Sequence, residues 1–223
     1  DRSTANDFVG TAVNEFGVRA AGGVYFYTNA ALTTGQRLIP GSNQWAGHSD
    51  VNLKHQFRDI DGEEVLARIA RMPVPEWSYL AQEGGIRHLG PTAQDFHAAF
   101  GLGEDPLYIG SMDADGVALA AVRALEARTR ETNERLARDN AELRVALAHA
   151  KARGADIPGL SAADYPLPTL APRLAALLDE VMDGRGFVRT AGFEINTLDV
   201  ADAARIYWGI GAQVWLFTIY DKD

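Results

Sequence analysis

The sequence predicts an α+β chain built from four segments. Three observations predict this class: short β-like stretches broken by Gly and Asn near the N-terminus, a long central run without Gly or Pro, and a Pro-rich change of composition after that run. The expected segments are a β-rich piece, a mixed α/β domain, a long coiled-coil helix and a short αβα fragment. Their residue ranges are 1–48, 49–116, 117–153 and 154–223.

The composition argues against several functional classes. The 223 residues are 47% hydrophobic, which is enough for one or two modest cores. The net charge of -9 disfavours binding to nucleic acid, because an acidic protein repels phosphate backbones. The absence of cysteine excludes disulfides, thiolate metal sites and a cysteine nucleophile. No apolar run approaches a transmembrane length and the first residues do not resemble a signal peptide, so we expect no membrane partner.

The first segment is expected to be β structure up to about residue 45. In "FGVRAAGGVYFYTN", Val18, Val24 and Phe26 stand in near-alternation with polar or small residues, interrupted by a pair of glycines. Strands this short cannot bury both faces of a sheet within forty-odd residues. Two interpretations therefore remain, namely an edge hairpin of a small domain or a β shaft intertwined between subunits.

The second segment alternates helix and strand patterns. "DGEEVLARIARM" carries apolar residues at helical spacing, with acids early and arginines late, as the helix dipole favours. "VPEWSYL" is strand-like. "GPTAQDFHAAFG" predicts a second helix, with Pro91 at its first position and Gly101 at its C-terminal cap.

The third segment predicts one long helix with a weak heptad seam. The residues that we assign to an oligomerisation seam are Leu119, Val122, Asn133, Leu136, Asn140, Leu143 and Leu147. The full heptad frame has ten a and d positions, and half of them are polar or small, so the coil is weak by itself; these are Glu126, Thr129, Asn133, Asn140 and Ala150. A solvated helix lying on a domain is the alternative. The lack of a broad apolar face favours self-association.

The fourth segment differs in composition and pattern from the long helix before it. A Pro-rich entry leads to an amphipathic helix, "LAPRLAALLDEVM", then to a short strand, "FVRTAGF", and to a second helix, "DVADAARIYWGIG". An apolar run, "VWLFTIY", follows near the end. This pattern predicts a folded αβα fragment.

Several motifs of the second and third segments occur in an order that points to a known family. They are "SDVNLKHQFRDIDGEEVLARIARMPVPEWSY", "IRHLGPTAQDFHAAFGLGED" and "DADGVALAAVRALEA". Over residues 49–147 the chain resembles the C-terminal intramolecular chaperone domain of phage tail spikes and fibres, the self-cleaving serine peptidase domain of endosialidase type. The resemblance implies a homotrimer with the preceding fibre β shaft as its client. It also implies a place in the virion tail fibre, in its assembly intermediate in the host cytoplasm, or in a prophage-encoded bacterial protein.

The resemblance further implies a single cut in cis between His48 and Ser49, made by a dyad of Ser49 and Lys54. A serine hydroxyl is a poor nucleophile until a base removes its proton, and a lysine can be that base only when neutral. The ordinary pKa of a lysine is about 10.4, and lowering it by about three units costs about 4 kcal/mol, which folding must supply. We therefore expect the reaction to be silent until the site is assembled.

Two polar residues are candidates for stabilising the oxyanion of that reaction. His88, in "RHLGPTAQDF", is the first, and Gln94 in the same motif is the second. A purely structural histidine is an equal interpretation of His88. Packing or capping of the helix is the favoured interpretation for Gln94 and its neighbour Asp95.

Residues 164–211 carry a different resemblance, to the N-terminal part of taurine-dioxygenase-like, iron-dependent oxygenases. It stops before the metal motif of that family, and the His48–Asp50 pair precedes it instead of following it. We therefore expect no metal and no cofactor. Two alternatives to the self-cleaving chaperone remain. One is a non-cleaving trimerisation module of a fibre or adhesin, and the weaker one is a truncated iron/2-oxoglutarate oxygenase fragment.

Overall fold

The computed structural model describes residues 12–155, 157–185 and 187–214, which form two compact units. The first unit is Asp1–Ile60 and the second is Asp61–Asp223. Strands and helices are both present, as the α+β class predicts. Among the described residues, no helix is both long enough and apolar enough to cross a membrane. The apolar run "WLFTIY" that begins at residue 215 lies outside the described residues.

The first unit contains an antiparallel meander of three short strands. They are β1 (Val24–Tyr27), β2 (Gly35–Leu38) and β3 (Trp45–Gly47), in the order β1-β2-β3. Both faces of this sheet carry exposed aromatic side chains, and none of the described residues in 12–60 is buried. The single chain therefore leaves this sheet without a core, as its short strands predict.

The second unit begins with two helices and a small hairpin. α1 (Gly62–Arg71) is capped by Asp61, whose carboxylate accepts hydrogen bonds from two backbone N–H groups of the first turn. β4 (Glu76–Trp77) pairs with β5 (His88–Leu89). α2 (Ala93–Phe100) begins after an N-cap at Thr92, so the proline expected at the first helical position stands before the cap instead. Gly101 closes α2 in the left-handed conformation that was expected of it.

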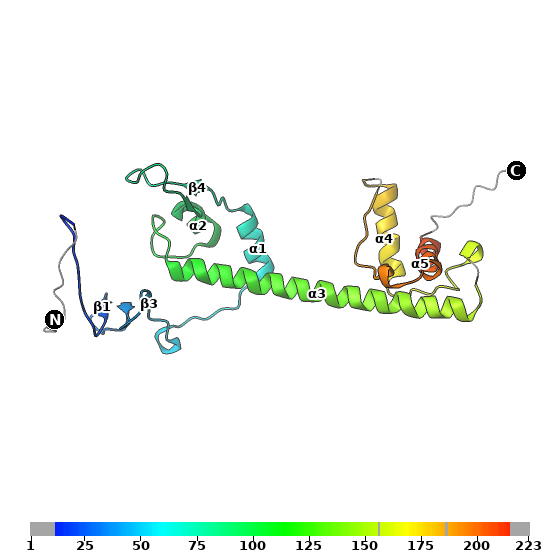
Figure 1. The fold of residues 1–223 in the computed structure, drawn as a ribbon, viewed down its shortest axis with the longest axis horizontal. Coiled ribbons are helices and arrows are strands. Elements are labelled where there is room, and N and C mark those ends of the chain that lie inside the picture. The colour runs from blue at the N-terminus through cyan, green and yellow to red at the C-terminus, as the bar shows by residue number, and fades with distance from the viewer. Residues whose placement is uncertain (1–11, 156, 186, 215–223) are drawn as a thin grey trace. The chain divides into compact units, whose positions relative to one another are not determined.

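The long helix α3 (Ser111–Ala152) begins six residues earlier than its pattern predicts. "DADG" therefore lies inside the helix, where Asp113 occupies the first turn. α1 packs on the N-terminal part of α3 (Figure 1). In that contact Gly62 lies so close to Ala124 that a β-carbon would meet its methyl group at 2.7 Å. Arg128 also forms an ion pair with Glu63.

The last segment packs on the C-terminal part of α3 and completes a core with it (Figure 1). It consists of α4 (Ala171–Met182), α5 (Val200–Gln213) and the short 3-10 turns Ile157–Gly159 and Ile195–Thr197. Tyr165 is fully buried in this core, and its hydroxyl donates to the Leu143 carbonyl at 2.9 Å. Asp139 of α3 also pairs with Arg173 of α4 at 2.6 Å. The fourth segment is thus one folded body with the helix that precedes it.

This packing corrects the seam expected on α3. Asn140, Leu143 and Leu147 are buried, at 8%, 2% and 6% exposure, against the last segment of the same chain. Leu136 also lies against Gly192 of that segment. The physical reason is that an apolar stripe on a helix is satisfied by any apolar partner, and here the chain supplies one locally. The seam residues that remain exposed are Leu119, Val122 and Asn133.

The strand expected at "FVRTAGF" does not form in the described residues of that stretch. Its backbone pairs with a side chain instead, because the Asn140 amide donates to the Gly192 carbonyl at 2.9 Å and accepts from the Glu194 N–H at 2.9 Å. Gly192 has a positive φ of 92°, which also breaks extended geometry. A buried asparagine therefore fulfils the role that a neighbouring strand would have had.

Candidate functional site

Ser49 and Lys54 lie at the two ends of one tight turn. The 3-10 helix Val51–Leu53 separates them, and Asp50 caps it by accepting from the backbone N–H and the side-chain amide of Asn52, each at 2.8 Å. The turn carries the lysine back towards the serine. As a result, Lys54 Nζ donates a hydrogen bond to Ser49 Oγ at 2.7 Å. The spacing of five residues thus becomes a direct contact because a capped turn stands between them.

The contact has the geometry of a nucleophile and its base. A separation of 2.7 Å allows a proton to pass directly from the serine hydroxyl to a neutral amine. Both side chains are exposed in the single chain. A lysine accepts a proton only in its neutral form, and burial is what favours that form. The single chain therefore aligns the pair without supplying the burial that its chemistry requires.

His48, on the other side of the Ser49 peptide nitrogen, directly follows β3. Its ring stacks on that of Tyr27 from β1, with the ring centroids 6.0 Å apart and the planes inclined by 22°. The meander thus holds the residue whose carbonyl a Ser49 nucleophile would attack. The peptide bond between His48 and Ser49 lies at the junction of the sheet and the capped turn.

His88 belongs to the second unit, where the β4–β5 hairpin holds it. Its ring stacks on Trp77, the residue that pairs with it in the hairpin, at 4.7 Å, and meets Tyr79 edge-on at 5.3 Å. Its Nε2 shares a 2.8 Å hydrogen bond with the side-chain oxygen of Gln82. His88 is therefore a half-buried, firmly oriented ring, as either of its two interpretations requires.

Gln82 is a residue that the sequence reasoning missed. It lies in the loop between β4 and β5, and no local pattern marks it as a partner of His88. A signal did exist for the aromatic neighbours, because Trp77 and Tyr79 are two positions apart in a strand-like stretch and so share a face.

Gln94 is exposed near the start of α2. Its neighbour Asp95 has a structural role, because its carboxylate accepts from the Thr92 hydroxyl at 2.6 Å while its N–H donates to the same hydroxyl at 3.1 Å. The bond from the Asp95 N–H is the N-cap of α2, and the Asp95 carboxylate holds the capping hydroxyl in place. The described structure therefore brings Ser49, Lys54 and the His48 carbonyl together in the first unit, whereas His88 and Gln94 belong to the second.

Residues 49–101 match the family of the chaperone of endosialidase. This matched range begins at Ser49 and ends at Gly101, the cap of α2, so it covers the Ser49–Lys54 pair, α1, the hairpin and α2. No curated protein and no solved structure matches the chain. The match to the chaperone family supports an intramolecular chaperone domain of self-cleaving peptidase type in this part of the chain.

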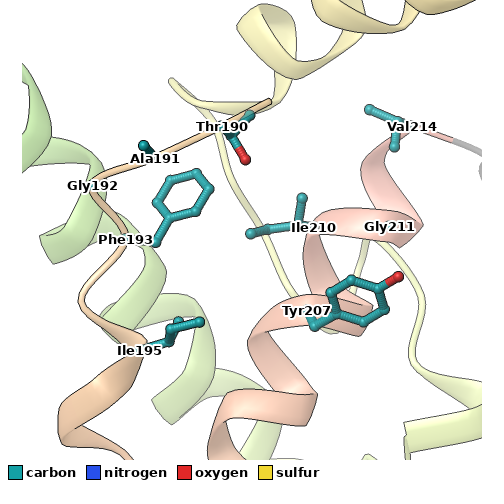
Figure 2. A pocket seen from close by; sticks show the side chains of 9 residues that line it. All are labelled: Thr190, Ala191, Gly192, Phe193, Ile195, Tyr207, Ile210, Gly211 and Val214. Carbon is teal, nitrogen blue, oxygen red and sulfur yellow. The ribbon is translucent and has the colours of Figure 1, made fainter. Parts of the chain in front are cut away.

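The resemblance of residues 164–211 to oxygenases has no support from these comparisons. An apolar pocket of about 540 Å³ does lie in this region, between α5 and the segment before it. Figure 2 shows Phe193 and Ile195 on one side and Tyr207 and Ile210 on the other. None of the lining residues is a histidine or a carboxylate, the side chains that such oxygenases use for iron. Within the described part of the chain, no group of three potential metal ligands occurs at all.

Proposed function

We propose that the chain is an intramolecular chaperone that assembles a fibre-type β shaft and then cuts itself off between His48 and Ser49. The observation that carries this proposal is the 2.7 Å contact between Lys54 Nζ and Ser49 Oγ. The start of the family match at Ser49, directly after the proposed cut, supports it.

The reaction follows from the positions of these groups. Neutral Lys54 takes the hydroxyl proton of Ser49, whose Oγ attacks the carbonyl carbon of His48. The tetrahedral adduct then breaks its bond to the Ser49 nitrogen, which receives the proton from the lysine, and an ester between His48 and Ser49 results. Water hydrolyses the ester and leaves a His48 carboxylate and a free Ser49 with a new amino terminus. The serine is thus used once, in cis.

Assembly of copies would supply what the single chain lacks. The meander has no buried residue, and the N-terminal part of α3 exposes apolar side chains. Those on one stripe of the helix are Met112, Leu119, Val122 and Leu125, at 50%, 71%, 64% and 49% exposure. Packing copies around an axis would bury these side chains and the sheet faces. We propose a homotrimer, in which burial around the dyad makes Lys54 a base.

Cleavage after assembly would make the client shaft kinetically stable, because the segment that guides its folding is then gone. Such a protein would act on a virion tail fibre or on its assembly intermediate in the host cytoplasm, whether encoded by a phage or by a prophage. The exposure of Ser49 and Lys54 favours a second candidate, in which the chain trimerises the shaft and stays attached.

Denaturing gels and intact mass of the purified full chain test this proposal. We expect two fragments from the wild type, the second beginning at Ser49, and one intact trimeric chain from Ser49→Ala. Lys54→Arg should also stay intact, because arginine keeps its proton at any workable pH. Ser42→Ala, which removes another exposed hydroxyl of the same unit, is the matched control and should be cut. An intact wild-type trimer would favour the non-cleaving module, and a cut Lys54→Arg would refute the dyad.

A further inference from the structure

One face of the meander carries a row of stacked rings that ends at His48. Tyr25 and Tyr27 of β1 stack at 5.8 Å with planes inclined by 12°, and Tyr27 stacks in turn on His48 at 6.0 Å. The Arg37 guanidinium of β2 lies 4.5 Å over the Tyr25 ring. The opposite face has its own aromatic pair, Phe26 with Trp45, at 5.6 Å.

The contact between Tyr27 and His48 crosses the central strand. β1 and β3 both pair with β2, so their backbones lie about 10 Å apart at twice the usual strand spacing. Tyr27 is paired with Gly35, and the pairing of Gln36 with Gly47 brings His48 next to Gly35 on the other side. Because the residue between them has no side chain, the two rings can lean over β2 and touch.

Gly35 is fixed at this position for a second reason. Its φ is 150°, and a β-carbon there would lie 1.9 Å from the Phe26 carbonyl oxygen. Only glycine fits this backbone, so the gap over β2 is a requirement of the strand pairing itself. The ring contact therefore forms only when all three strands are paired in this register.

We propose that Tyr27 is a positioning residue for self-cleavage, which holds His48 across Gly35 and so makes the cut depend on the register of the client sheet. This inference rests on the proposed function. His48 supplies the carbonyl that Ser49 attacks, and its only described ring contact is with Tyr27. A register slip by one residue would turn either ring to the other face and break the contact.

The register dependence gives the assembly a local signal of correct folding. Two requirements then converge on one peptide bond. The turn capped by Asp50 aligns Lys54 with Ser49, and the paired meander holds the ring of His48, the residue whose carbonyl that nucleophile attacks. A small misalignment of reacting atoms lowers a rate steeply, so a meander out of register would leave the chain uncut.

The test compares single-turnover cleavage rates of full-length variants after dilution from denaturant. Tyr27→Leu removes the ring that touches His48, and Tyr27→Phe keeps it. Phe26→Leu is the matched control, because it removes a ring from the neighbouring position of the same strand and breaks an aromatic pair on the opposite face. Assembly is measured separately by light scattering, with each substitution placed in the Ser49→Ala background.

We expect Tyr27→Leu to be cut about tenfold more slowly than the wild type, with an unchanged oligomer mass. Tyr27→Phe and Phe26→Leu should stay within about twofold of the wild type. In a double-mutant cycle, Tyr27→Leu should have no further effect when His48→Leu is already present, because the two residues act through one contact. His48→Phe, which keeps a ring at this position, should be cut faster than His48→Leu.

Several results would overturn this role for Tyr27. They are a Tyr27→Leu chain that is cut at the wild-type rate, a Phe26→Leu chain that is slowed equally, and additive effects in the cycle. If Tyr27→Leu does not assemble, the ratio of the His48→Phe and His48→Leu rates decides, and equal rates refute the stack. A wild-type chain that is never cut would instead overturn the proposed function, and the positioning role with it.

Discussion

Replacing Leu143 by alanine should release the last segment of the chain from α3. Leu143 is 2% exposed and packs in the core that includes Tyr165, Leu167 and Ile206. Truncating a leucine buried this deeply costs about 3 kcal/mol, through lost transfer energy and a residual cavity. That cost corresponds to a factor of about a hundred in the equilibrium for opening this core.

Hydrogen exchange of the uncut Ser49→Ala protein measures this opening directly. We expect Leu143→Ala to lower the protection of amides in 171–182 and 200–213 about a hundredfold, equally at low and high protein concentration. Concentration independence matters because a contact between copies would weaken on dilution. Val122→Ala is the matched control on the same helix, since Val122 is 64% exposed and touches none of this core.

The opposite outcome for Leu143→Ala would be a last segment that stays protected while amides of α3 lose protection, and lose more of it on dilution. Leu143 would then lie between copies, as the heptad pattern alone suggests. For Val122→Ala we expect the reverse, namely a weaker oligomer by light scattering with unchanged exchange in the last segment.

Two further predictions concern pH. Burial raises the pKa of Tyr165 above its ordinary value, so the unfolded state loses the phenolic proton first and stability should fall by about 1.4 kcal/mol per pH unit above about pH 10. Urea melts of Tyr165→Phe should show a smaller fall in unfolding free energy above about pH 10 than those of the wild type. An equal fall would show that a group other than Tyr165 causes it. Burial alone would raise the pKa of Glu142, but hydrogen bonds from Thr169 and Leu170 more than offset it and lower the pKa. The stability that the Glu142 carboxylate contributes should be present above about pH 4.5 and lost as the pH falls further. Acid titration of Glu142→Gln should therefore show a smaller loss of unfolding free energy than the wild type, and an equal loss would show that Glu142 does not contribute.

Much of the local structure could be predicted from the sequence, because it depends on neighbours in the chain. The acids and arginines of α1, the cap at Gly101 and the long run without Gly or Pro are local signals, and each marks an element that the structure contains. Short-range hydrogen bonds and helix periodicity carry this information without any tertiary contact. The pairing of Ser49 with Lys54 is different, because only the family resemblance implies it, although the turn between them is capped locally by the adjacent Asp50.

What covers the apolar stripe of α3 could not be read from its periodicity. Leu143 and Leu147 fit a seam between copies as well as they fit the core that they form with the last segment, because burial of apolar surface does not depend on which chain supplies the partner. The side-chain amide of Asn140 likewise took the place of a strand partner, which only the folded chain could bring within reach. Tyr27 and Gln82 were missed for the same reason. Each touches a residue that is distant in sequence or reached through a loop, so their contacts with His48 and His88 depend on strand register and loop closure.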